Sequence, residues 1–454
     1  MMSFLGLSIF GAVLLMLPIS NSNGEWLSPV DAFFMSVSSA CVTGLVVLDI
    51  GTDLTIFGQL VILFLIQVGG LGYMTLTTLL IYLVGKRLSI SESKIFKLAN
   101  NSELQIDIKD FIIKIGLLTL ACELIGAVLL LKDSVNIVLT NNPETKTAYL
   151  SGAFHAIFHS ISAFCNAGLC LYSNGLESHH ENYFFLLIFS SLIILGGLGY
   201  TVLHEVLKYF DKNKVNFSLT LHTKIALKTT CILLISGLVI QFALIYIQDL
   251  PTLVEHGLSL KDKAYEIWHN LWVAFFQTCS ARTAGFNSVS INDLGEASHL
   301  FLIVWMFIGA CPGSTAGGIK VTTLVVIFAT IYSSVKNKEF VKVGNRSITQ
   351  SNQRKAIIVF VSAVAMIIFF TWILFIIEGA HHFNFLDQLF EVTSAFNTVG
   401  LSTGITGKLS DPSLILLTIC MLIGRPGPLL FLMAIIPEEK GKELRCPEEG
   451  ILIG

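Results

Sequence analysis

Four short segments of this chain combine a glycine with small or β-branched neighbours, and they are variants of one phrase. Each follows an apolar stretch that is too short to cross a membrane, and the four glycines are 124, 117 and 115 residues apart. Glycine permits positive φ angles, so such a segment can turn its backbone carbonyls to one side. A ring of carbonyl oxygens from four such strands is the chemistry by which proteins select dehydrated potassium. The segments are Val42-Thr43-Gly44, Asn166-Ala167-Gly168, Thr283-Ala284-Gly285 and Thr398-Val399-Gly400, each followed by leucine or phenylalanine.

A simpler interpretation is that each glycine only ends a helix, as glycine often does. For a single phrase that interpretation would be preferred. Four phrases in equivalent places favour a filter, because the glycines, the short helices before them and their spacing along the chain then all indicate the same structure. Irregular backbone at membrane depth is tolerated only where it lines water or is buried in protein.

The elements that must position the phrases occur in the same order each time: a long apolar segment, a short apolar helix, the phrase, and a second long segment. Only the long segments have the length needed to cross the hydrocarbon, which predicts eight spans and four half-spans. The carboxyl ends of the short helices would meet around an axis and favour a cation. The predicted ranges are 3–18, 108–132, 221–248 and 355–379 for the first long segments, 29–41, 149–164, 264–279 and 385–396 for the short helices, and 55–84, 181–208, 298–335 and 412–436 for the second long segments.

Composition indicates a lipid environment. Hydrophobic residues make up 54% of the 454 residues and charged residues only 13%, against about 25% charged in a soluble domain. The net charge of −3 gives no indication of a surface that binds nucleic acid. The nine cysteines form no CxxC pair and are interpreted as packing residues. Residues 3–17 lack a basic region and a cleavage site, so they are predicted to be the first span rather than a signal peptide.

The positions of the basic residues predict the orientation in the membrane. In the eight-span arrangement, most of the 28 lysine and arginine residues lie in connectors on one side, at 85–114, 203–230, 320–356 and in the C-terminal tail. Positive loops stay in the cytoplasm, so both termini are predicted to be cytoplasmic. The exceptions are Arg425, inside the last predicted span, and Lys132, Lys146, Lys261, Lys263, Arg282 and Lys408 on the opposite side.

Across about residues 3–436 the chain resembles the Trk/Ktr/HKT superfamily of potassium transporters, and the phrases resemble that family's filter sequences. The resemblance implies an all-α polytopic membrane protein with four pseudo-fourfold repeats of helix, pore helix, filter and helix around a central pore. The repeats would be 3–84, 108–208, 221–335 and 354–436. Supporting motifs are Gly69-Gly70-Leu71-Gly72-Tyr73, Gly196-Gly197-Leu198-Gly199-Tyr200, Gly313-Ser314-Thr315-Ala316-Gly317-Gly318-Ile319-Lys320 and Gly424-Arg425-Pro426-Gly427-Pro428.

The chain starts directly at the first repeat, so it resembles the KtrB type of membrane subunit rather than the Trk type. Members that prefer sodium carry serine at the first filter glycine, and Gly44 therefore favours potassium. By the same resemblance, two copies form a homodimer on a cytoplasmic ring of Rossmann-type, nucleotide-binding KtrA subunits. The chain itself has no GxGxxG after a strand. No resident cofactor is expected; potassium is the substrate, and sodium as a coupling or activating ion stays open.

Two features predict a gate on the pore axis. The apolar run through Ile308 gives way to a segment with Pro312 and several glycines, which predicts a break inside the membrane. In the family, the matching residues Gly313 to Gly318 form an intramembrane gating loop; a static kink is the alternative. Arg425 is an intramembrane charge, and by resemblance it projects into the pore below the filter. A structural salt bridge or a snorkelling arginine is the alternative for Arg425.

Two further groups of ionisable residues lie near the phrases. Arg282 precedes the third phrase and Glu391 lies in the fourth short helix, so a pair between them would support the filter from behind; two separately solvated charges are the alternative. His155 and His159 share a helix face, but no third ligand and no HExxH pattern accompany them. A packing or hydrogen-bonding role is therefore predicted for both histidines.

The leading hypothesis is a potassium-uptake subunit of the cytoplasmic membrane. A sodium- or ammonium-conducting relative is the alternative within the same class, because the field around a flexible ring decides selectivity. The hypothesis of an intramembrane enzyme that uses the histidines is rejected because too few metal ligands accompany them. No enzyme activity is therefore predicted.

Overall fold

The computed structural model describes residues 2–72, 108–141, 146–209, 218–255, 260–379, 382–427 and 431. The connector expected at 85–107, the ends of the segments predicted at 55–84 and 412–436, and the basic tail lie outside the described residues. The described chain is almost entirely helical, with one two-stranded hairpin, β1 (Lys342–Val343) and β2 (Arg346–Ser347), between two of the helices.

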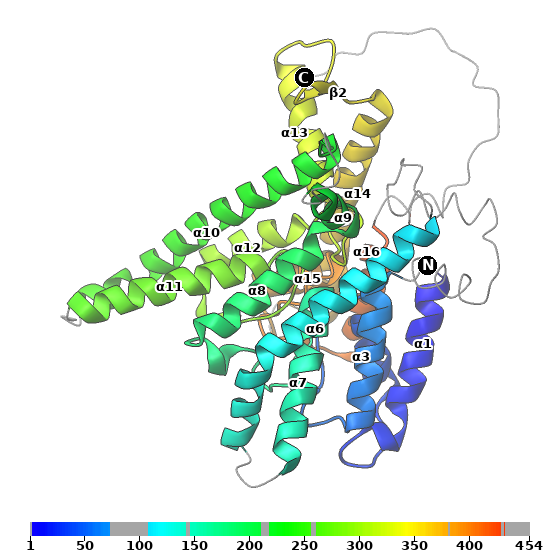
Figure 1. The fold of residues 1–454 in the computed structure, drawn as a ribbon, viewed down its shortest axis with the longest axis vertical. Helices are drawn as coiled ribbons and strands as arrows, with labels where there is room; N and C mark the ends of the chain where they lie inside the picture. The colour runs from blue at the N-terminus through cyan, green and yellow to red at the C-terminus, as the bar shows by residue number, and fades with distance from the viewer. Residues whose placement is uncertain are drawn as a thin grey trace.

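The predicted order of long helix, short helix, phrase and second helix is present four times (Figure 1). The first long helices are α1 (Met2–Met16), α6 (Ile108–Asn141), α10 (Leu221–Glu255) and α14 (Gln350–Glu378). The short helices are α2 (Pro29–Ala40), α7 (Lys146–Cys165), α11 (Leu260–Ser280) and α15 (Phe385–Phe396). The second members are α3 (Ile56–Leu71), α8 (Tyr183–Leu198) with α9 (Tyr200–Tyr209), α12 (Glu296–Phe307) with α13 (Val321–Val335), and α16 (Asp411–Gly424).

Side-chain caps account for the start of several helices. The Thr55 hydroxyl accepts the Gly58 amide at 3.3 Å before α3, and the Asn182 side chain accepts the Phe185 amide at 3.2 Å before α8. The Thr349 hydroxyl accepts the first-turn amide at the start of α14 in the same way. Each bond satisfies one of the amides that a helix start leaves without an intrahelical partner.

Each short helix has a fully buried phenylalanine at nearly the same distance before its phrase. These residues lie ten positions before the phrase glycine in the first, second and fourth cases and nine before it in the third. Burial of such a ring contributes about 1.5–3 kcal/mol, so it fixes the depth of the helix in its apolar cluster. The residues are Phe34, Phe158, Phe276 and Phe390, all with no exposed side-chain surface.

The second helices were predicted to be uninterrupted in all units but the third, and for the second unit this was wrong. α3 ends at Leu71, α16 ends at Gly424, and α8 and α9 meet at Gly199 with a bend of 98°. α12 and α13 are separated by a loop, as predicted. Among the described residues, three helices are long and apolar enough to span, namely Ile113–Thr140, Leu221–Asp249 and Gln350–Glu378, and the bent pair would be a fourth. The other predicted spans correspond to shorter apolar helices.

The bend at Gly199 has a tertiary cause. Gly199 has a φ of +85° and lies against the loop between α12 and α13, where a Cβ atom would come 2.8 Å from the carbonyl oxygen of Pro312. The amide of Tyr200 donates to the carbonyl of Gly313 at 3.1 Å. Only glycine combines this φ with this approach, so the helix turns away where it meets the loop.

Candidate functional site

The glycines of the four phrases meet in one ring, in the order in which they occur along the chain. Each glycine lies against the carbonyl oxygen of the residue before the next glycine, so a side chain at any of these positions would strike its neighbour. A built Cβ atom would lie 2.6 Å from Ala167 O at Gly44, 2.7 Å from Ala284 O at Gly168 and 2.6 Å from Val399 O at Gly285, and it would collide with Thr43 O at Gly400. The ring is therefore closed by backbone, with carbonyl oxygens at its seams.

The backbone has the same unusual conformation in all four phrases. The glycines have φ values of +67° to +100°, and the residue two positions before each glycine also has a positive φ. Three of those residues are β-branched, for which this region costs energy and persists only when the surroundings enforce it. The residues and their φ values are Val42 at 56°, Asn166 at 59°, Thr283 at 70° and Thr398 at 49°.

Glycines of two second helices and of the loop between α12 and α13 make room for these strained residues. A Cβ atom at Gly69 would lie 2.9 Å from the Val42 side chain, and one at Gly196 would lie 3.2 Å from the Asn166 side chain. A Cβ atom at Gly317 would collide with the Thr398 hydroxyl. The glycine-rich motifs therefore serve the phrases directly, by letting the second helices approach them.

Buried serines near the ends of the short helices also touch the phrases, and they were not predicted from the sequence. The Ser38 hydroxyl accepts the Gly44 amide at 3.2 Å and donates to the Leu45 carbonyl at 2.7 Å. The signal that would have found them is their recurrence shortly before every phrase glycine. These serines are Ser38, Ser162, Ser280 and Ser394.

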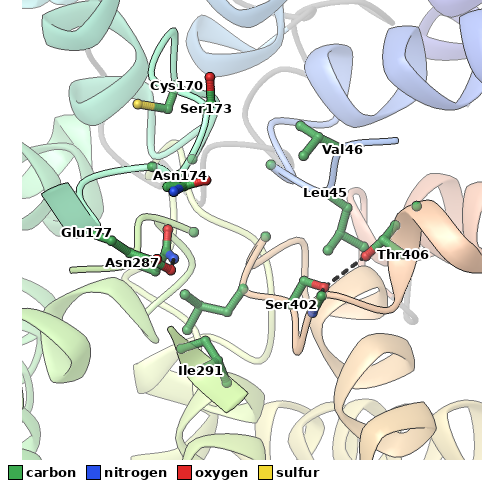
Figure 2. Close-up of a pocket in the computed structure, with 18 of the residues that line it drawn as sticks. Leu45, Val46, Cys170, Ser173, Asn174, Glu177, Asn287, Ile291, Ser402 and Thr406 are labelled. Atoms are coloured by element: carbon green, nitrogen blue, oxygen red, sulfur yellow. Dashed lines mark hydrogen bonds between the residues drawn. The ribbon is translucent and has the colours of Figure 1, made fainter. Parts of the chain in front are cut away.

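A cavity of about 350 Å³ opens on one side of the ring, and all four phrase glycines contribute to its lining. The segments that follow the phrases form its walls, and Figure 2 shows their side chains around the opening. Glu177 and Asn287 lie together in this wall, with the Asn287 amide donating to the Glu177 carboxylate at 2.6 Å. The mouth of the ring is thus polar, with Asp49 and Glu177 as acidic residues in its lining.

The loop between α12 and α13 closes on itself beside the ring. The Gly309 amide donates to Ile319 O at 2.9 Å, and the Val321 amide donates to Ala310 O at 3.1 Å. A Cβ atom at Gly317 would lie 2.7 Å from Asn397 O, immediately before the fourth phrase. The predicted break therefore exists, and Gly317 and Gly318 of this loop lie directly against Asn397 and the phrase of the next unit.

Two cationic side chains hold this loop. The Arg425 guanidinium donates from Nη1 to Thr315 O at 2.6 Å and from Nη2 to Gly69 O at 2.7 Å. Lys320 Nζ donates to Ala316 O at 2.5 Å. No described carboxylate forms an ion pair with either cation. Arg425 therefore joins the loop to the end of α3, and the structure brings together the residues that were predicted for a gate.

The possible pair between Arg282 and Glu391 does not form. The buried Glu391 carboxylate accepts the hydroxyls of Ser402 and Thr406 and, at 3.2 Å, the amide of Thr403. Arg282 is 7% exposed and its Nε has no hydrogen-bond partner among the described residues. Glu391 therefore orders the segment after the fourth phrase without an arginine, and Ser402 and Thr406 belong to the cavity wall (Figure 2).

The histidines have contacts of the packing kind that was predicted. His159 is fully buried, its Nε2 accepts the Leu171 amide at 3.1 Å, and its ring stacks on Tyr172 with centroids 4.5 Å apart. The His155 ring lies 6.0 Å from the His159 ring. Within the described part of the chain, no three metal-ligating side chains come together.

Comparisons with known proteins agree with this geometry. The sequence model of one protein family, TrkH, described as a cation transport protein, matches residues 2–443. The chain is 36% identical to the Ktr system potassium uptake protein B of Bacillus subtilis (strain 168), over 98% of this chain and 94% of that protein. It is 37% identical to the protein of the same name from Vibrio alginolyticus, over 100% of this chain and 94% of that protein.

A third relative and a solved structure extend the comparison. The potassium/sodium uptake protein NtpJ of Enterococcus hirae is 32% identical over 99% of this chain and 95% of its own length. The crystal structure of the potassium transporter TrkH from Vibrio parahaemolyticus has a TM-score of 0.67 and 19% identity, and the match covers 96% of this chain and 85% of that one. The last match shows a shared fold. The chain therefore belongs to the TrkH family of cation transport proteins, a family of transporters and not of enzymes.

Proposed function

We propose that this chain is the ion-translocating subunit of a potassium-uptake system in the cytoplasmic membrane. The observation that carries the proposal is the ring of Gly44, Gly168, Gly285 and Gly400, with the carbonyl oxygens of their preceding residues at the seams. Such oxygens take the place of the water molecules that a cation loses when it is dehydrated. Three relatives named for potassium uptake align over nearly the whole chain and support the choice of ion.

The ion path follows from the order of features along the ring axis. A cation enters the polar cavity, sheds water at the carbonyls of the phrases, and then meets the loop at residues 313–318. The loop and Arg425 act as a gate, because the Arg425 side chain fixes the loop to the end of α3 and adds a positive charge beside the path. A cation passes when these hydrogen bonds give way.

The assembly and orientation follow the resemblance to KtrB-type subunits. Both termini lie in the cytoplasm, four repeats of one chain surround one pore, and two chains form a homodimer. The partner is a cytoplasmic ring of Rossmann-type, nucleotide-binding subunits of the KtrA kind. The relatives named as parts of a Ktr system support a partner of this kind. Sodium as a coupling or activating ion stays open, and the Enterococcus relative is named for the uptake of both potassium and sodium.

Rubidium uptake tests the proposal. Potassium-depleted cells that lack their own potassium uptake should accumulate rubidium when they express this chain together with a KtrA-type partner. Excess external potassium should compete with rubidium, whereas equal sodium should compete much less. Equal competition by sodium would favour the sodium-conducting alternative, and competition by ammonium would favour the ammonium-conducting one. Cells that take up no rubidium while the chain is present in the membrane would contradict the proposal.

The pH outside the cell should change the apparent affinity through Glu177. This carboxyl lies in the loop at the cavity mouth, where burial and the nearby Asp293 raise its pKa above the ordinary value of glutamate, about 4.3. Protonation removes its negative charge and so weakens the attraction for cations, and the raised pKa places this loss at a higher external pH than for an ordinary glutamate. We expect the KM for rubidium to rise as the pH falls.

Glu177→Gln should show a raised KM already at neutral pH and a flatter pH profile. Glu181→Gln is the matched control, because Glu181 lies four residues away, binds the Tyr265 hydroxyl at 3.1 Å and is not part of the cavity lining. An unchanged pH profile in Glu177→Gln would show that another group at the mouth governs the effect.

A further inference from the structure

One serine in each short helix lies next to the filter phrase that follows it. Ser38, Ser162 and Ser394 precede their phrase glycines by six residues, and Ser280 precedes Gly285 by five. All four side chains are fully buried. A buried hydroxyl must satisfy its hydrogen-bonding capacity within the protein, so its partners show what it holds.

The backbone carbonyl of each serine binds the phrase at the residue before the glycine. The four bonds have nearly the same length, although the third helix is one residue closer to its phrase. The amides of Thr43, Ala167, Ala284 and Val399 donate to the carbonyls of Ser38, Ser162, Ser280 and Ser394 at 2.8, 2.8, 2.9 and 2.8 Å. The residue whose own carbonyl lies at a seam of the ring is therefore held by a serine in every phrase.

The serine hydroxyl binds the phrase a second time, at or after the glycine. Ser38 and Ser162 donate to the carbonyls of Leu45 and Leu169 at 2.7 Å, and Ser280 donates to the carbonyl of Phe286. In the first and fourth phrases the hydroxyl accepts the glycine amide, at 3.2 Å from Gly44 and 3.0 Å from Gly400. In three phrases the carbonyl after the glycine is thus bound to the short helix.

These contacts decide which oxygens are available to an ion. A carbonyl that accepts a buried hydroxyl lies towards the short helix, so the oxygens of Leu45, Leu169 and Phe286 do not compete with those at the seams. In these three phrases the two contacts of the serine bracket the glycine on both sides, whereas Ser394 binds the amides of Val399 and Gly400. The distance of the phrase from the ring axis then depends on the serine rather than on the phrase alone.

We propose that Ser38, Ser162, Ser280 and Ser394 are positioning residues that set the diameter of the carbonyl ring and thereby its preference for potassium over sodium. This inference rests on the proposed function as a potassium filter. Selectivity depends on the number and field strength of the coordinating oxygens. A ring that is free to relax inwards or to splay would accept the smaller ion more readily.

The alternative is that each serine only ends its helix. That role would affect folding and abundance but would leave the ratio of rubidium to sodium uptake unchanged in the molecules that fold. The chain contains a matched control in the same helix. The hydroxyl of the fully buried Ser39 donates to Met35 O at 2.7 Å, inside the helix, and the Ser39 contact with the first phrase is made by its backbone carbonyl, which accepts the Val42 amide at 3.1 Å and is kept in Ser39→Ala.

The experiment compares Ser38→Ala with Ser39→Ala in the full chain with its partner, in membranes. We expect Ser38→Ala to lower the rubidium-to-sodium uptake ratio about fivefold, the factor that corresponds to one hydrogen bond. The KM for rubidium should rise, whereas Ser39→Ala should keep the wild-type ratio. Ser38→Cys, which keeps a weak donor of similar size, should fall between alanine and wild type, and it replaces Ser38→Ala if that variant does not accumulate.

The outcomes separate the two proposals. A wild-type chain that does not prefer rubidium to sodium would overturn the proposed function. A selective wild-type chain in which Ser38→Ala and Ser39→Ala have the same ratio would overturn the inference about the serines alone. A reduced ratio in both variants would assign the effect to packing of the short helix and would also overturn it.

Discussion

Replacing Gly44 with serine should lower the preference for potassium over sodium by on the order of tenfold, which corresponds to about 1.4 kcal/mol. A Cβ atom at this position would lie 2.6 Å from the carbonyl oxygen of Ala167 and 3.2 Å from Cα of Gly400. The clashing atoms are backbone, so the ring itself must move. Displaced carbonyls no longer compensate a dehydrated potassium ion for its lost water, and discrimination against sodium falls.

The measurement is rubidium and sodium uptake by the same membranes, because their ratio does not depend on the amount of protein. Gly24→Ser is the matched control. Gly24 also has a left-handed backbone, with φ of +69°, but no atom lies within 4 Å of a Cβ built there. Gly24→Ser therefore carries the backbone strain without the collision, and it should keep the wild-type ratio. An unchanged ratio in Gly44→Ser would contradict the assignment of the ring as the filter.

The phrases were predictable from sequence because their chemistry lies in the backbone. A glycine with a left-handed φ is required wherever four carbonyl strands approach one another, and the requirement recurs at nearly constant spacing. The bounds of α15 were predicted without error, since Phe385 follows a polar turn and Asn397 ends the apolar run. The segment from Gly309 to Gly318 was also predicted as a break, because Pro312 lacks an amide donor and the glycines around it favour an open chain.

The bend between α8 and α9 was not predictable in the same way. Residues 183–203 form a largely apolar stretch, and the glycines within it are compatible with a membrane helix. The bend depends on the approach of Pro312 O and Gly313 O, which come from a loop more than 100 residues later in the chain. A contact of this kind leaves no signal in the sequence near the bend. The loop that makes the contact does leave one, in its own proline and glycines.

The surroundings of Glu391 show a second limit. An arginine and a glutamate near adjacent phrases suggested a pair, but hydroxyl donors 11 and 15 residues after Glu391 satisfy the carboxylate instead. Ser402 and Thr406 looked like ordinary loop residues in the sequence. The filter serines were overlooked for a related reason, because the third phrase is one residue closer to Ser280 and the common spacing is broken there.

Removing the Arg425 side chain should increase the rate of ion uptake, by about tenfold at low external potassium. The guanidinium binds Thr315 O in the loop and Gly69 O at the end of α3, and a hydrogen bond from a charged group contributes about 1.5–3 kcal/mol. Arg425→Gln loses the positive charge and the fork that spans both carbonyls. The loop is then released from α3, and the repulsion of an approaching cation disappears.

A lysine at the same position separates the two contributions. Arg425→Lys keeps the charge but has a single ammonium group, which cannot reproduce the two divergent hydrogen bonds of the guanidinium. Uptake close to the wild-type rate in Arg425→Lys would show that the charge is the barrier. A rate close to that of Arg425→Gln would show that the link between loop and α3 is the barrier.

The control for Arg425 is Arg354→Gln, which removes the same charge from an exposed position near the start of α14. Its rate should equal that of the wild type. Rates are measured as initial rubidium uptake per amount of inserted protein, with the regulatory partner present. If Arg425→Gln transports at or below the wild-type rate while its selectivity is intact, Arg425 stabilises the open path, and the role of the loop and Arg425 as a closed gate is contradicted. Because the Arg425 guanidinium binds carbonyls of the loop and of α3 and not those at the seams of the ring, selectivity should stay the same in all Arg425 variants, which separates a gating effect from damage to the ring.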